Sequence, residues 1–137
     1  MPEVRYRVIG RGEPRPWIRL WLKLGDQEIP VPGIVDSGAD RSSVPLRLAP
    51  SLGFAYEASD PKTGGGVGGP YTYFEATNKV AVRSEVGVFF LDRPNLNPVL
   101  PFLLLGRSDF FAAFRITFDQ RQMKMLIDTY GAPATTN

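Results

Sequence analysis

The segment Ile34-Val35-Asp36-Ser37-Gly38-Ala39-Asp40 places an aspartate directly after an apolar strand and inside a turn of small residues. Glycine at position 38 permits a sharp turn and lets its own N–H approach the carboxylate of Asp36 closely. The hydroxyl of Ser37 lies in reach of neighbouring backbone groups and would hold the turn in place. Because Asp-Ser-Gly is also a common turn sequence, the tripeptide alone indicates a well-presented carboxylate and no particular chemistry.

A hairpin is predicted to lead into this turn. From Trp17 to Leu24 an apolar residue occupies every second position on one face, which is typical of a half-buried strand. Gly25-Asp26 supplies a turn, and Glu28–Val35 is expected to return as the second strand. Pro30 and Pro32 are two residues apart, so their backbone nitrogens, which carry no hydrogen, would face the same side of the strand. Because a proline is tolerated at a sheet edge and not in its middle, this side is expected to be an edge.

The rest of the chain predicts short elements separated by Gly, Pro and Asn, a pattern that favours strands and turns over a helix bundle. Residues 58–70 offer almost nothing to bury and are expected to form a mobile loop. The other expected elements are a short helix from Pro45 to about Leu52 that ends at Gly53, strands at Tyr71–Val82, Glu85–Leu91 and Val99–Leu105 with turns near Asn78 and Arg83-Ser84, a loop at Arg93–Pro98, a helix at Ser108–Phe114 with Ser108 as its N-cap, and a hairpin of Arg115–Asp119 and Met123–Asp128. One mostly antiparallel all-β domain over residues 1–137, with one or two short helices, is therefore predicted.

The composition excludes several classes of chemistry. The 137-residue chain contains no Cys and no His. The first absence removes disulfides, thiol nucleophiles and Cys-ligated zinc, and the second removes Ser–His–Asp and Cys–His catalysis and the commonest metal ligand. An enzyme of this composition must use carboxylates, hydroxyls, Lys, Arg or backbone groups. We therefore expect no metal and no cofactor.

The charge distribution bears on nucleic-acid binding. Sixteen basic and fourteen acidic residues leave a formal charge of +2, which attracts phosphate weakly over long range. Five arginines lie within residues 1–19, beside Trp17 and Trp21, and such a mixture is found in nucleic-acid-binding segments. We favour a solvated basic N-terminal arm over residues 1–15 and expect no nucleic-acid partner.

No apolar run approaches the length of a membrane span, and the first ten residues lack the apolar centre of a signal peptide. The sequence therefore predicts a cytoplasmic protein with no membrane partner. The polar tail over residues 130–137 is expected to be frayed.

Three segments, taken in order, resemble the retroviral-type aspartic proteases, or retropepsins. Residues 34–40 match the active-site pattern of that family, which is two apolar residues, Asp, Ser or Thr, Gly and Ala. Leu103-Leu104-Leu105-Gly106-Arg107, before an expected helix, is similar to the second signature of the family. Between them, Gly66-Val67-Gly68-Gly69 falls where the family has a flap that covers the substrate. With the flanking strands, the resemblance covers residues 17–128.

The resemblance implies a retropepsin-like half-barrel that supplies half of an active site. Pepsin-like enzymes carry two Asp-Thr/Ser-Gly motifs in one chain, whereas this sequence has one. Two copies are therefore expected to pair as a homodimer, with Asp36 of each chain at a two-fold axis. Ser37 is expected to hydrogen-bond across this axis, and Gly38 and Ala39 are expected to line the cleft.

Two supporting features follow from the same resemblance. Asp40 and Arg107 are expected to form an ion pair within one chain, and the loss of either partner would leave a costly unpaired charge. Gly66, Val67, Gly68 and Gly69 are expected to close over a bound peptide and exclude water.

The expected function is that of a homodimeric aspartic endopeptidase, which hydrolyses peptide or protein substrates with a water activated by paired Asp36 carboxylates. Two alternatives stay open. The first is a catalytically silent module of the same fold for dimerisation or peptide binding, and the second is a nucleic-acid-binding protein that uses the basic arm.

Gly64, Gly66 and Gly69 also satisfy G-x-G-x-x-G, but the β-prone residues 70–74 follow where a dinucleotide site needs a helix, so that site is excluded.

Overall fold

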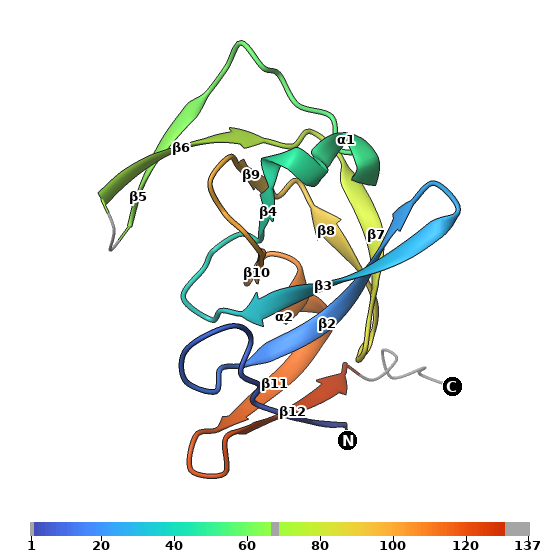
Figure 1. The fold of residues 1–137 in the computed structure, drawn as a ribbon, viewed down its shortest axis with the longest axis vertical. Helices are drawn as coiled ribbons and strands as arrows, with labels where there is room; N and C mark the ends of the chain where they lie inside the picture. The colour runs from blue at the N-terminus through green and yellow to red at the C-terminus, as the bar shows by residue number, and fades with distance from the viewer. Residues whose placement is uncertain (1, 67–68, 131–137) are drawn as a thin grey trace, which may run out of the picture.

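The computed structural model describes residues 2–66 and 69–130. These residues form short strands and three single helical turns (Figure 1). The strands are β1 (Glu3–Arg5), β2 (Trp17–Leu24), β3 (Gln27–Val35), β4 (Ser43–Pro45), β5 (Lys62–Gly66), β6 (Gly69–Glu75), β7 (Lys79–Ser84), β8 (Gly87–Asp92), β9 (Asn95–Asn97), β10 (Leu103–Leu105), β11 (Phe114–Asp119) and β12 (Lys124–Thr129). The helices are α1 (Ala49–Leu52) and α2 (Phe110–Ala113), and a 3-10 turn, η1, covers Leu46–Leu48.

The strands form two sheets. The larger has the order β5-β6-β9-β4-β10-β3-β2-β7-β8, and the smaller has the order β1-β12-β11. The smaller sheet lies at the end of the molecule opposite the β5–β6 hairpin (Figure 1). Only β10 with β3 and β4 with β9 pair in parallel among the described strands. The predicted all-β, mostly antiparallel class with two short helices is therefore confirmed.

One hydrophobic cluster connects the two sheets. Ile18, Leu20 and Leu22 are almost fully buried, as the alternation along β2 predicts. The rings of Phe89, Phe110 and Phe114 pack together with centroids 5.1–5.9 Å apart and join β8 to α2 and β11. The smaller sheet contributes the buried residues Val4, Met125 and Ile127 to the same cluster. No helix in the described part of the chain is long and apolar enough to cross a membrane.

The β2–β3 hairpin agrees with its prediction to within one residue. β3 lies inside the sheet order, but β10 pairs only with its last three residues, Gly33–Val35. Pro30 and Pro32 therefore have β2 on one side and, among the described residues, no strand on the other. The predicted edge is confirmed locally, although β3 as a whole is not an edge strand.

The loop predicted over 58–70 is confirmed for residues 58–61, which lie in no strand or helix, and is wrong for residues 62–66 and 69–70, which are in strands. β5 and β6 form an antiparallel hairpin in which Gly66 lies opposite Gly69, while Val67 and Gly68 lie outside the described residues. At one position of this hairpin a glycine of β5 makes room for a tyrosine of β6. A Cβ at Gly64 would lie 2.7 Å from Cζ of Tyr71, so a larger residue would displace this ring.

Proline and glycine move the ends of several other elements. β10 begins at Leu103 and not at Val99, which is 79% exposed, because Pro98 and Pro101 cannot donate to a ladder. Residues 95–97, predicted as loop, pair in parallel with β4 as β9. The turn expected at Arg83-Ser84 lies at positions 85–86, between β7 and β8.

The helical segment near position 50 is also shifted. Helical turns begin at Leu46, so Pro45 precedes the helix instead of starting it. Pro50 falls in the first turn of α1, and the segment is split into η1 and α1. Gly53, with φ of 85°, ends α1 as predicted, since glycine adopts this left-handed conformation without strain.

The N-terminal arm is attached to the fold at a few points, although most of its described residues are exposed, as a solvated arm predicts. β1 pairs with β12, and Val4 is buried between them and the core. Both Nη atoms of Arg7 bind the carboxylate of Glu85, with Nη2 2.7 Å from Oε2, and the Arg19 N–H donates to the same carboxylate at 2.8 Å. One half-buried carboxylate therefore joins the arm, β2 and the β7–β8 turn.

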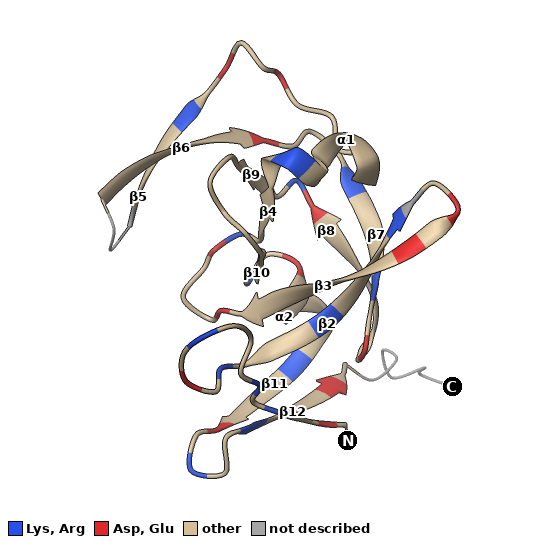
Figure 2. Cartoon of the chain, viewed as in Figure 1, with Lys and Arg blue, Asp and Glu red and all other residues tan. Residues whose placement is uncertain are grey.

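Some of the features that suggested nucleic-acid binding are used inside the fold, among them the two tryptophans and Arg7. Trp17 is buried and its ring packs edge-on against Phe102, with centroids 4.9 Å apart. Trp21 lies on the outer face of β2 with the guanidinium of Arg83 above its ring. Basic and acidic residues are interspersed along the arm and β2–β3 (Figure 2). No continuous cationic stripe with free aromatic rings is formed there.

We expect Glu85→Gln to lower the free energy of unfolding at pH 7 by about 1–2 kcal/mol, between the values for exposed and buried ion pairs. Burial alone would raise the pKa of Glu85, but the hydrogen bonds from Arg7 and Arg19 outweigh it and lower this pKa. The stabilisation should therefore be present above the ordinary carboxyl pKa and disappear as pH falls through the lowered value. Urea denaturation over a pH series measures both effects.

The matched control is Glu28→Gln, because Glu28 pairs with Arg83 at the surface, where both side chains are more than 40% exposed. Its loss should cost at most about 1 kcal/mol. Equal losses for the two variants would show that Glu85 does not anchor the arm.

Candidate functional site

Asp36 is held by the turn in which it lies. β3 ends at Val35, and the Asp36 N–H donates to the carbonyl of Leu105 at 3.0 Å. The Gly38 N–H donates to Oδ1 of Asp36 at 2.9 Å, which is the close approach that glycine at this position predicts. The Ala39 N–H closes the turn onto the carbonyl of Asp36 at 3.2 Å. Backbone donors therefore orient the carboxylate of Asp36.

A second turn, after β10, packs directly against the first. The N–H groups of Arg107 and Ser108 each donate at 2.9 Å, to the carbonyls of Ala39 and Asp40 respectively. A Cβ added at Gly106 would lie 2.6 Å from the carbonyl carbon of Arg41 and 2.9 Å from the carbonyl oxygen of Ala39. The two turns can therefore pack at this distance only because position 106 is glycine.

A buried hydrogen-bond chain holds the two turns together. The Gly106 N–H donates to Oγ of Ser42 at 2.9 Å, and the Ser42 hydroxyl donates to Oδ1 of Asp109. Asp109 also accepts the N–H of Phe110 at 2.7 Å and the N–H of Asp92 at 3.1 Å. This carboxylate therefore ties the Asp36 turn to α2 and β8.

Sequence reasoning missed Asp109. It assigned the N-cap of α2 to Ser108, but α2 begins at Phe110 and Asp109 is the N-cap. Asp and Ser are similarly favoured at this position, so local preference did not separate them. Asp109 is only 6% exposed, and burial raises its pKa although the hydrogen bonds from Ser42, Asp92 and Phe110 oppose that rise.

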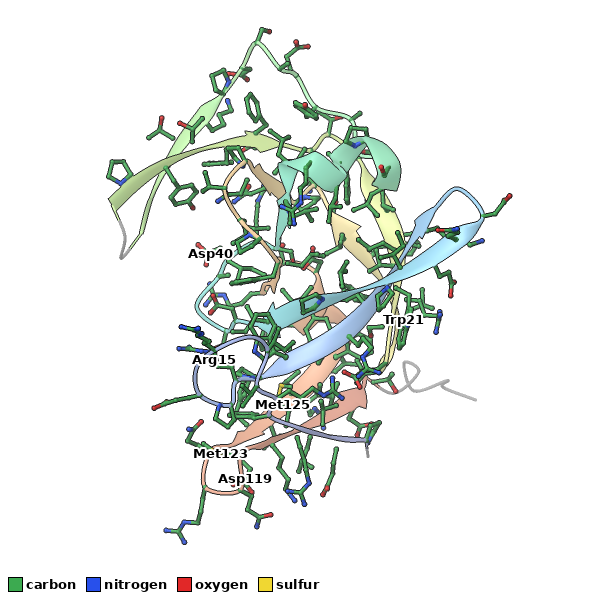
Figure 3. All side chains as sticks on the ribbon, in the orientation of Figure 1. Arg15, Trp21, Asp40, Asp119, Met123 and Met125 are labelled. Carbon is green, nitrogen blue, oxygen red and sulfur yellow. The ribbon has the colours of Figure 1, made fainter. Side chains whose placement is uncertain are left out.

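Asp40 and Arg107 lie together, as the resemblance implied. Nη2 of Arg107 is 2.8 Å from Oδ1 of Asp40, and Asp40 lies on the loop between β3 and β4 (Figure 3). The side chains are 85% and 63% exposed. Because water surrounds both charges, the pair contributes at most about 1 kcal/mol, and the expectation of a costly unpaired charge does not apply. The two turns are connected instead by hydrogen bonds between their backbones.

A groove of about 640 Å³ lies between the Asp36 turn and the β5–β6 hairpin, which extends over this side of the molecule (Figure 1). The turn contributes its carboxylate and small residues, the hairpin contributes two tyrosines, and the ends of β4, β9 and β10 complete the wall. The lining residues are Asp36, Gly38, Ala39, Asp40, Arg41, Ser43, Gly65, Tyr71, Tyr73, Glu75, Asn95 and Leu104. The groove therefore combines one catalytic candidate with donors, acceptors and aromatic surface.

A second groove, of about 420 Å³, lies between the N-terminal arm and the proline side of β3. It is lined by Arg7, Val8, Ile9, Ile18, Arg19, Pro30, Val31 and Pro32. No carboxylate or hydroxyl is among these residues, so this groove offers no group for acid–base or nucleophilic chemistry. Residues 2–66 and 69–130 also contain no group of three or more acidic side chains able to hold a metal ion.

Four of the ten predicted site residues line the larger groove. Asp36, Gly38, Ala39 and Asp40 line it, whereas Ser37 is exposed beside it. Gly66 and Gly69 lie opposite each other in the β5–β6 hairpin, and the other two predicted flap residues lie outside the described residues.

In comparisons with known proteins, the sequence matches no family model and no curated protein. The evidence for function therefore comes from the groove itself.

Asp109→Ala should lower the free energy of unfolding by about 2–3 kcal/mol, because it leaves buried donors of Ser42, Asp92 and Phe110 without an acceptor. Ser108→Ala is the matched control and should change it by about 0.5 kcal/mol or less, since Ser108 is exposed. The raised pKa of Asp109 means that its proton is held more tightly in the folded state. The free energy of unfolding should therefore fall as pH rises from the ordinary carboxyl pKa through the raised value, because the folded state resists losing this proton. Similar free energies of unfolding for the two variants would show that the buried Asp109 carboxylate does not connect the Asp36 turn to α2 and β8.

Gly106→Ala should destabilise the fold by about 1–3 kcal/mol or more, because its Cβ would collide with backbone that cannot rotate away. Gly65→Ala is the control, since its Cβ would meet no atom within 4 Å. Thermal unfolding of both variants measures the difference. If Gly106→Ala melts with the wild type, the two turns do not pack as described.

Proposed function

We propose that the protein is a homodimeric aspartic endopeptidase of retropepsin-like half-barrel fold, in which each chain supplies Asp36. The observation that supports this most directly is the oriented carboxylate of Asp36 in a groove that a β-hairpin spans. A chain without His or Cys leaves carboxylates, hydroxyls, Lys, Arg and backbone groups for hydrolysis, and a carboxylate mechanism is compatible with this set. One carboxylate cannot take a proton from water and donate one to the substrate carbonyl at the same time, so a second copy is needed.

The second copy changes the proton affinity of the site. Two carboxylates about 3 Å apart repel by roughly 5 kcal/mol at an effective dielectric constant near 20. They therefore hold one proton between them at mildly acidic to neutral pH. One Asp36 is then a base and the other an acid, although the two chains are identical.

Peptide hydrolysis follows from this division. The ionised Asp36 removes a proton from a water while the water oxygen forms a bond to the scissile carbonyl carbon. The protonated Asp36 of the partner subunit gives its proton to the carbonyl oxygen, which produces a neutral tetrahedral diol. One carboxyl group then gives its proton to the amide nitrogen while the other carboxylate removes a proton from a diol hydroxyl. The C–N bond breaks, and a carboxylic acid and an amine leave. The dyad ends with the single proton with which it began.

The neighbouring residues support this reaction in stated ways. The Gly38 N–H donates to Oδ1 of Asp36 and fixes the orientation of this carboxylate. Gly38 and Ala39 leave room for a peptide backbone beside the carboxylate. We assign closure over the peptide to the hairpin segment Gly66-Val67-Gly68-Gly69, and a contact across the two-fold axis to Ser37.

The strand pairing restricts how two copies can meet. β12 has β1 on one edge and β11 on the other, both from the same chain. A partner therefore cannot add a strand along Lys124–Leu126, where both edges of β12 are occupied. We place the dimer contact at the loop that carries Asp36, where the carboxylates must meet in any case.

The test is cleavage of a peptide library between pH 4 and pH 7, followed by mass spectrometry. Asp36→Asn should reduce cleavage at least about 100-fold, within the range for loss of a general acid–base group. Asp26→Asn, in the exposed β2–β3 turn, should leave it unchanged. Dimers of one wild-type and one Asp36→Asn chain should also be inactive, because both carboxylates are required.

Two outcomes would contradict the proposal. One is cleavage that persists in Asp36→Asn. The other is a specific activity that does not depend on protein concentration while sedimentation shows only monomers. Peptide binding without cleavage by the wild-type dimer would instead favour the catalytically silent module.

A further inference from the structure

Arg41 lies in the groove that contains Asp36. It follows the Asp36 turn directly and is exposed, and it lines the groove together with Ser43 and Asn95. Ser43 and Asn95 lie opposite each other in the β4–β9 pair, and the Asn95 N–H donates to the carbonyl of Ser42 at 2.9 Å. Arg41, Ser43 and Asn95 therefore place one cation and two neutral donor groups on one part of the wall.

Two other charged groups near this wall, Asp40 and Arg93, are in ion pairs. Asp40 is paired with Arg107. Arg93, beside the groove, is 3.1 Å from the carboxylate of Asp92.

Arg41 differs from these groups. Among residues 2–66 and 69–130 no carboxylate lies within 4.0 Å of its guanidinium. Its only hydrogen bond in this part of the chain is a long one, 3.4 Å, to the carbonyl of Arg93. Five guanidinium N–H donors are thus served by a single weak acceptor, in a groove of a size that takes a peptide side chain.

We propose that Arg41 binds an acidic side chain of the substrate, so that the enzyme prefers peptides with Glu or Asp at one position near the cleaved bond. This inference rests on the proposed function. A guanidinium binds a carboxylate with two parallel hydrogen bonds, and it repels a basic side chain at the same place. Ser43 and Asn95 can donate to the same carboxylate. The negative charge of the Asp36 pair repels acidic peptides in general, so a local cation is needed to accept them.

The experiment profiles cleavage sites in a peptide library for the wild type, Arg41→Gln and Arg41→Glu. The position with the strongest enrichment of Asp and Glu is then tested with peptide pairs that differ only by Glu or Gln there. We expect kcat/KM to be about fivefold higher for the Glu peptide with the wild type, the effect of one exposed ion pair. The ratio should fall to about one in Arg41→Gln. In Arg41→Glu it should invert, and a Lys peptide should be cleaved best.

Arg93→Gln is the matched control, because it removes a neighbouring cation that already has a carboxylate partner. It should keep the Glu preference, whereas an effect of net charge would reduce the preference in both variants equally. Wild-type cleavage without an acidic preference, or a preference that survives in Arg41→Gln, would overturn the role of Arg41 and leave the proposed function intact. Absence of Asp36-dependent cleavage would overturn the proposed function and this inference with it.

Discussion

The close approach of two backbone turns, at Gly106 and at residues 39–41, is the constraint on which the candidate site depends. Three inward-facing hydrogen bonds cross this contact, two to carbonyls of the Asp36 turn and one to the hydroxyl of Ser42. The Ser42 hydroxyl passes the connection to Asp109, which is buried at the start of α2. The position of the Asp36 carboxylate is therefore set by a buried network and not by the exposed ion pair beside it.

This arrangement separates support from recognition within one short loop. Residues 38 and 39 are small, Ser42 points into the core, and Asp40 and Arg41 face water. Backbone atoms hold the loop, so the outward side chains are free to change without loss of the turn. A substitution at position 41 would then alter what the groove accepts while the carboxylate of Asp36 stays in place. Binding residues on a rigidly held loop generally behave in this way.

Local patterns were sufficient for the β2–β3 hairpin and for the turn at Gly38, because alternation and glycine geometry act over a few residues. They were insufficient where a partner distant in sequence decides the structure. Residues 95–97 become a strand because β4 and β6 lie on either side of them, and Gly64 of β5 lies against the ring of Tyr71 in β6. Asp109 connects three segments only because the fold brings Ser42 and Asp92 to its carboxylate. None of these contacts leaves a periodic signal in the sequence.

The prolines of β3 also protect the protein against aggregation. An interior strand that lacks a neighbour along part of its length is a template on which another unfolded chain can grow. Pro30 and Pro32 interrupt the row of donors there, so such growth cannot propagate toward Asp36. The outer strand β8 has no proline and exposes Val88 and Phe90. Fibril-like association of this protein would therefore be expected to start from β8, at the end of the large sheet opposite the β5–β6 hairpin.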